Sequence, residues 1–221
     1  MKVAILNYNA GNIQSVTFAL NRIGIEPVLT DSIEELSGAD KIIFPGVGEA
    51  SSAMNYLKNK GLDKVIPNLN QPLLGICLGM QLMCRSSEEG NTDCLGIFET
   101  SVRRFHSPFE GGRRSRGDVA DVADVMSVIH VMNVMDAKIP QIGWNTIYNL
   151  KGSLFKGIPE NEFQYFVHSY YVGKCKDTIA TTTYINEYSS ALQKNNFYGV
   201  QFHPEKSSKA GEQLLKNFIE L

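Results

Sequence analysis

The chain has 221 residues, 43% of them apolar and 20% charged, so we expect a packed core in a single domain over residues 1–221. The formal net charge is −2 and neither half is strongly basic, which argues against nucleic acid or an anionic membrane as the main partner. The first apolar run is too short for a signal peptide, and no stretch is long enough to span a membrane, so we expect a cytoplasmic protein.

Alternating strand and helix patterns open the chain. Residues 2–6 form an apolar run typical of a buried strand, and residues 13–23 place apolar side chains at helical spacing before Gly24. Further strands are expected at 26–30 and 41–44. This rhythm predicts an α/β fold with a mostly parallel central sheet flanked by helices.

A fourth strand, which begins after Pro72, leads directly into Cys77 and then into a helix expected at 79–85. The second half is richer in aromatic and β-branched residues, which favour strands. This half predicts strands at 162–172, 178–185 and 197–202. A C-terminal helix is expected at 207–220, with Ser207 or Ser208 as its N-cap.

The strongest local signal is the sequence GICLG at 75–79, which has a nucleophile between two glycines at a predicted strand-to-helix turn. Glycine on both sides removes clashes at a strained turn, and the start of the following helix favours a thiolate. The other three cysteines form no C-x-x-C pair and have no histidine at ligand spacing, so we expect no metal and no cofactor. Cys77 is therefore the candidate nucleophile, although a buried cysteine in a tight turn is the simpler alternative.

A cysteine nucleophile needs a base, and His203 is the best candidate among the histidines. His203 ends the predicted strand 197–202, Pro204 forces a turn, and Glu205 follows within reach of the imidazole. His168 is the rival base, but it lies within an aromatic strand pattern, so we expect it to be structural or to line a pocket.

Three motifs in this order resemble the class I, triad-type glutamine amidotransferases: PGVG at 45–48, GICLGMQ at 75–81 and QFHPEKS at 201–207. Three more resemble the glutaminase subunit of imidazole glycerol phosphate synthase: NYNAGNIQSV at 7–16, PQIGWNTI at 140–147 and FVHSYY at 166–171. The resemblance covers nearly the whole chain, apart from roughly residues 106–137.

The resemblance implies that Cys77 attacks the side-chain amide of L-glutamine, while His203 transfers the proton and Glu205 orients His203. Ammonia would pass through a tunnel to a (β/α)₈-barrel synthase subunit that forms a heterodimer with this chain. The partner would make imidazole glycerol phosphate and an aminoimidazole-carboxamide ribonucleotide in histidine biosynthesis.

The same resemblance assigns roles to other residues. The amides of Val47 and Leu78 would form the oxyanion hole. The substrate-binding residues would be Gly48, Gln81, Ser169 and Tyr170, and the partner-facing residues would be Asn12, Trp144 and Asn145. Trp144 could instead belong to the core.

The segment at about 106–137 departs from the family, because it is longer than the usual connection and joins a basic, glycine-rich part to an apolar part. It lies next to a partner-facing motif in sequence, so one hypothesis is that it alters docking or gating of the synthase subunit. Three alternatives remain: a glutaminase that serves another acceptor, a partner-independent cysteine hydrolase, and a non-catalytic binding protein.

Overall fold

The computed structural model describes residues 1–8, 11–106 and 137–221, so nearly all of the apparent insertion at about 106–137 lies outside the described residues. An 11-stranded sheet runs through the described part in the order β2-β1-β3-β4-β13-β12-β10-β7-β5-β6, with β11 paired to β12. Its strands are β1 (Val3–Leu6), β2 (Val28–Thr30), β3 (Lys41–Phe44), β4 (Leu73–Ile76), β5 (Cys84–Ser87), β6 (Thr92–Asp93), β7 (Phe98–Arg104), β10 (Tyr170–Val172), β11 (Thr178–Thr183), β12 (Glu187–Lys194) and β13 (Phe197–Val200).

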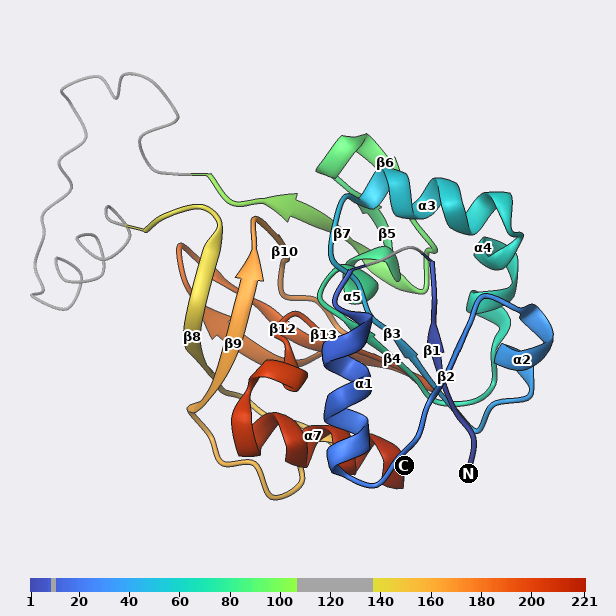
Figure 1. Cartoon of the computed structure of the whole chain (residues 1–221). Helices are drawn as coiled ribbons and strands as arrows, with labels where there is room; N and C mark the ends of the chain where they lie inside the picture. The colour runs from blue at the N-terminus through green and yellow to red at the C-terminus, as the bar shows by residue number, and fades with distance from the viewer. Residues whose placement is uncertain (9–10, 107–136) are drawn as a thin grey trace, which may run out of the picture.

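Helices cover both faces of this sheet (Figure 1). Side chains alternate along β1, so that Val3 and Ile5 pack in one core cluster while Ala4 and Leu6 pack in the other. Helices α1 and α7 lie on the face of the sheet that carries Val3 and Ile5 (Figure 1). Helices α2, α3 and α4 lie on the face that carries Ala4 and Leu6. The helices are α1 (Ile13–Arg22), α2 (Ile33–Ser37), α3 (Ala50–Asn59), α4 (Leu62–Val65), α5 (Leu78–Leu82) and α7 (Ser208–Glu220).

The pairs within β2-β1-β3-β4-β13 are all parallel, whereas β12 and β10 run antiparallel to their neighbours. The predicted α/β fold, with a mostly parallel centre and a β-rich second half, is therefore confirmed. Among the described residues, no helix combines the length and apolar character needed to cross a bilayer.

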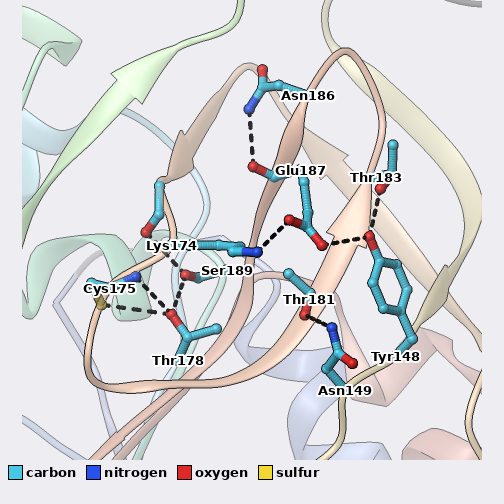
Figure 2. Close-up of polar contacts among 11 residues, drawn as sticks. Tyr148, Asn149, Lys174, Cys175, Thr178, Thr181, Thr183, Asn186, Glu187 and Ser189 are labelled. Atoms are coloured by element: carbon cyan, nitrogen blue, oxygen red, sulfur yellow. Dashed lines mark hydrogen bonds and ion pairs between the residues drawn. The ribbon is translucent and has the colours of Figure 1, made fainter. Parts of the chain in front are cut away.

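A second sheet pairs β8 (Gln141–Ile147) with β9 (Glu162–His168) in antiparallel register. Residue Tyr148, just after β8, forms a bridge to Thr181 of β11. Its hydroxyl lies 2.6 Å from the hydroxyl of Thr183 and donates to Glu187 at 3.1 Å (Figure 2). These contacts attach the two-stranded sheet to the edge of the large one.

The strands expected at 26–30, 178–185 and 197–202 are each shorter, at Val28–Thr30, Thr178–Thr183 and Phe197–Val200, and two predicted elements were wrong by more. The helix expected at 79–85 ends at Leu82, because the residues from Cys84 onward pair as β5 with β6 and β7. The strand expected at 162–172 is interrupted at Ser169, because β9 pairs with β8 whereas β10 joins the large sheet. In both cases pairing with a distant segment decides the local structure.

Candidate active site

The three motifs found in the sequence follow three neighbouring parallel strands. β4 lies between β3 and β13, and Ile76 of β4 is opposite Val200 of β13. Because the carboxyl ends of parallel strands meet at one edge of a sheet, Cys77 and His203 arrive beside each other there. The PGVG segment at 45–48 leaves β3 at the same edge.

Cys77 occupies a strained turn between β4 and α5. Its φ of 54° and ψ of −109° lie in a region that L-residues rarely adopt. Its backbone N–H donates to the Val200 carbonyl at 2.8 Å, which continues the pairing of β4 with β13 through the turn. The side chain is buried but lines a cavity.

Close packing explains why glycine flanks this turn. A Cβ on Gly79 would lie 1.8 Å from the carbonyl oxygen of Phe44, at the end of β3. A Cβ on Gly75 would lie 2.4 Å from the methyl carbon of Met83. The glycine pattern that predicted the turn is therefore needed so that α5 can approach β3.

His203 and Glu205 form a buried pair, with 2.8 Å between His203 Nδ1 and Glu205 Oε1. A carboxylate only accepts, so Nδ1 carries a proton and Nε2 is the ring nitrogen left for Cys77, which lines the same cavity as His203. The Asn12 side chain donates to the same Oε1 at 2.5 Å. The three predicted catalytic side chains thus lie together, and Asn12 is hydrogen-bonded to the last of them.

The turn that carries His203 is fixed by backbone contacts. Its N–H donates to the Tyr165 carbonyl of β9 at 2.8 Å. The Ser207 hydroxyl donates to the His203 carbonyl at 2.7 Å and accepts from the Tyr165 N–H at 2.9 Å. Ser207 precedes α7, as expected of an N-cap, but its side chain does not cap the helix and instead holds this turn.

Charge around His203 favours its imidazolium form. Burial alone lowers the pKa of His203, but the Cys77 thiolate and then the Glu205 carboxylate outweigh burial and raise that pKa to about 10. The imidazolium is therefore retained at neutral pH and is lost only as the pH rises through about 10. The geometry therefore places an imidazolium beside the sulfur, where it can act as the acid for a Cys77 nucleophile.

We predict that Glu205→Gln keeps this geometry but removes the negative charge that helps to raise the pKa of His203. The variant should lose about 10²- to 10⁴-fold in kcat for glutamine hydrolysis, because the imidazolium acid is less stable. The pKa of His203 should also fall, so the alkaline limb of the pH–rate profile should move to lower pH. A profile measured from pH 6 to 10 checks this, and an unchanged alkaline limb would contradict it.

The two residues expected at the oxyanion hole both lie at the cavity. The Leu78 N–H donates to the Gly46 carbonyl at 3.3 Å, so in this conformation the donor is already occupied. Val47 is 37% exposed and contributes to the cavity lining. Tyr8 holds the PGVG segment in place, because its buried hydroxyl donates to the Pro45 carbonyl at 2.7 Å.

The cavity beside Cys77 has a volume of about 320 Å³. It brings together every predicted catalytic, oxyanion and substrate residue except Glu205, which lies behind His203. Those residues are Val47, Gly48, Cys77, Leu78, Gln81, Ser169, Tyr170 and His203. The sequence reasoning missed Glu89, Pro140, Val167 and Lys206, which complete the lining with His168.

Two of the missed residues carry opposite charges into the cavity. Glu89 is half-buried and accepts from the Ala50 N–H at 2.9 Å, and burial raises the pKa of its carboxyl group. Lys206 is exposed and follows Glu205 in the turn. Lys206 lies within the QFHPEKS motif, whereas Glu89 lies in no motif and reaches the site because the 3₁₀ turn Glu89–Asn91 packs against α3 and β5.

Gln81 and Tyr170 contact each other, since the Gln81 Nε2 donates to the Tyr170 carbonyl at 3.0 Å. The same carbonyl lies 2.7 Å from His168 Nδ1. His168 is fully buried, and burial lowers its pKa to about 4, so its imidazole is neutral at pH 7. His168 therefore lines the cavity, as predicted, and its imidazole carries no positive charge there.

The three residues expected to face a partner differ in their surroundings. Trp144 is 53% exposed and stands edge-on to Tyr165, so it does not belong to the core. The Asn145 side chain donates to the Thr183 carbonyl at 2.9 Å. Asn12 is half-buried and turned toward Glu205. Of the three, only the Trp144 side chain is largely free at the surface.

Comparisons with known proteins identify the family of the chain. The family described as glutamine amidotransferase class-I matches residues 4–221. Imidazole glycerol phosphate synthase subunit HisH of Bacteroides fragilis (strain YCH46) is 53% identical over 221 residues, which are 100% of both chains. The subunit of the same name from Blochmanniella pennsylvanica (strain BPEN) is 41% identical over 223 residues and also covers 100% of both chains.

A solved structure of a glutamine amidotransferase has a similar fold, with a TM-score of 0.68 at 18% identity over 100% of this chain and 98% of that chain. Another, of a glutamine amidotransferase from Thermotoga maritima, has a TM-score of 0.58 at 14% identity and covers 100% and 83%. These distant structures support the fold, and the relatives at higher identity extend the match over the full length. The chain belongs to the class-I glutamine amidotransferase family, in the group of the imidazole glycerol phosphate synthase subunit HisH.

Proposed function

We propose that this chain hydrolyses L-glutamine to glutamate and ammonia, and delivers the ammonia to a synthase partner. The partner makes imidazole glycerol phosphate and an aminoimidazole-carboxamide ribonucleotide in histidine biosynthesis. The observation that carries the proposal is that Cys77 and His203 line one cavity while Glu205 forms a hydrogen bond with His203 Nδ1 at 2.8 Å. The names of the full-length relatives support the pathway, and from them we also propose a cytoplasmic location.

The proposed reaction has two halves. The Cys77 thiolate attacks the side-chain carbonyl carbon of glutamine, and the carbonyl electron pair moves onto oxygen. When this intermediate collapses, the C–N bond breaks and His203 gives its proton to the leaving ammonia. Water then attacks the thioester while His203 accepts a proton, and the C–S bond breaks to release glutamate and the thiolate.

Glu205 would hold the Nδ1 proton of His203 throughout, so that Nε2 performs both transfers. The oxyanion would be stabilised by the N–H groups of Val47 and Leu78. Because the Leu78 N–H donates to the Gly46 carbonyl, that bond has to open before the amide can serve the oxyanion. This step is where a bound partner could raise the rate.

Glutamine carries an ammonium and a carboxylate group, and the cavity offers a complement to each. We propose that Glu89 attracts the ammonium group and Lys206 the carboxylate, since both line the cavity with Cys77. The polar contacts along the substrate would come from Gly48, Gln81, Ser169 and Tyr170, as the resemblance implies.

The partner would dock on the outer face of β8 and β9, next to the cavity. Ile142 (63% exposed), Trp144 (53%) and Phe163 (55%) are exposed there on a strand pair whose end reaches Val167 in the cavity lining. Large exposed apolar side chains gathered on one face are typical of a protein interface. We propose that a (β/α)₈-barrel subunit covers this face, with Asn12 and Asn145 at its margin.

The deciding experiment measures glutamate production by the chain alone and with the barrel synthase and its nucleotide substrate. We expect low activity alone and a large increase in the loaded complex, with imidazole glycerol phosphate formed in step with glutamate. Equal activity with and without the partner would favour a partner-independent hydrolase. Stimulation by a different synthase alone would favour a glutaminase for another acceptor.

A further inference from the structure

Two buried glutamines form a short hydrogen-bonded chain that ends at the nucleophile. Gln81 of α5 donates from Nε2 to the Tyr170 carbonyl at 3.0 Å and to the Gln201 Oε1 at 2.9 Å. Gln201, which follows β13 and is 0% exposed, places its Nε2 3.6 Å from the Cys77 Sγ. This contact joins the two glutamines to the reacting sulfur.

The orientation of both amides follows from the backbone carbonyl at the start of the chain. A carbonyl oxygen only accepts, so Gln81 has to present its NH₂ group to Tyr170. Since the same NH₂ group also faces Gln201, Gln201 has to present its oxygen to Gln81. Its own NH₂ group is then directed at Cys77, and rotating either amide by 180° would set like groups against each other.

The surroundings of the sulfur show which of its forms this arrangement suits. The Val167 carbonyl, 3.7 Å from Sγ, can accept from a thiol but offers nothing to a thiolate. A buried thiolate without donors is costly, because its charge has left water. Gln201 supplies a donor 3.6 Å from the sulfur, and His203, which lines the same cavity, supplies a nearby positive charge.

We infer that Gln201 is a catalytic residue that donates a hydrogen bond to the Cys77 thiolate, and that Gln81 is the positioning residue that aims it. The inference rests on the proposed function for its role in glutamine hydrolysis. In that reaction the sulfur loses its charge on attack and regains it when glutamate leaves, so Gln201 stabilises both the attacking and the departing thiolate.

The test compares Gln201→Leu and Gln201→Glu with the wild type by the rate at which iodoacetamide alkylates Cys77 between pH 5 and 10. Mass spectrometry of the peptide that carries Cys77 follows the reaction, so other cysteines do not interfere. Loss of a donor to a charged group should move the pH midpoint of alkylation up by about one to two pH units in the leucine variant. It should move further in the glutamate variant, which adds a negative charge.

We also expect kcat/KM for glutamine to fall about ten- to hundred-fold in Gln201→Leu. Gln213→Glu, an exposed position on α7, is the matched control and should leave the alkylation midpoint at its wild-type value. Because Gln201→Glu keeps the acceptor for Gln81, it provides a readout if the leucine variant does not fold.

Unchanged midpoints in folded Gln201 variants would overturn the inference, because a merely structural glutamine does not affect ionisation of the sulfur. The alkylation assay uses no glutamine and no partner. A shifted midpoint in a protein that hydrolyses no glutamine would therefore support the hydrogen bond and reject the proposed function. Glutamine hydrolysis together with an unshifted midpoint would support the proposed function and reject the hydrogen bond.

Discussion

Cys77→Ala should reduce glutamine-driven synthase turnover by on the order of 10⁵-fold, to background, while leaving ammonia-driven turnover within about two-fold of the wild type. Removing the sulfur removes the atom that we propose forms the acyl intermediate, whereas the barrel partner would still accept ammonia from solution. The alanine side chain fits the same turn, so assembly should be unaffected. Paired assays of the same complex with saturating glutamine and with ammonium salt check both halves.

Cys94→Ala is a suitable control, because Cys94 is half-buried and lies outside the cavity lining. Burial and then the Asp93 carboxylate raise the pKa of Cys94 to about 12, so its thiol stays protonated and unreactive at neutral pH. A glutamine-analogue electrophile should accordingly label Cys77 and spare Cys94. Retention of glutamine-driven turnover in Cys77→Ala would exclude this cysteine as the nucleophile and, with it, the triad.

The sequence sufficed for the elements in which local pattern and final environment agree. The apolar run at 41–44 becomes β3 with the expected boundaries, and strand pairing then brings PGVG, Cys77 and His203 together at one edge. Parallel neighbours that each end in a motif leave little freedom in where the motif residues meet. This is why the cavity unites residues that are far apart in the chain.

Side-chain contacts between distant segments could not be predicted in the same way. Asn12 and Glu205 are 193 positions apart, and the family resemblance implied a partner-facing role for Asn12. Gln201 lies inside a recognised motif, but only the positions of Gln81 and the Tyr170 carbonyl reveal where its amide points. Glu89 likewise depends on the packing of the 3₁₀ turn Glu89–Asn91 against α3 and β5. Such contacts depend on tertiary packing and leave no periodic signal.

The second large effect is structural, and it concerns Gly79. Its position is so close to β3 that a Cβ would lie 1.8 Å from the Phe44 carbonyl oxygen, a backbone atom that cannot move without shifting the strand. Gly79→Ala should therefore cost about 3 kcal/mol of folding stability, at the upper end of the overpacking range.

For a chain of this size, that loss lowers the melting temperature by roughly 6 to 12 °C. Glutamine hydrolysis should fall with it, because the same shift moves the Cys77 turn away from His203. Gly173→Ala is the matched control, since a Cβ there meets nothing within 4 Å and the backbone does not require a positive φ. Thermal unfolding followed by circular dichroism compares the two variants, and equal melting temperatures would mean that α5 can retreat from β3 without cost. The geometry of the Cys77 turn and the stability of the sheet both depend on the close approach of Gly79 to Phe44. We therefore expect Gly79→Ala to lose stability and glutamine hydrolysis together.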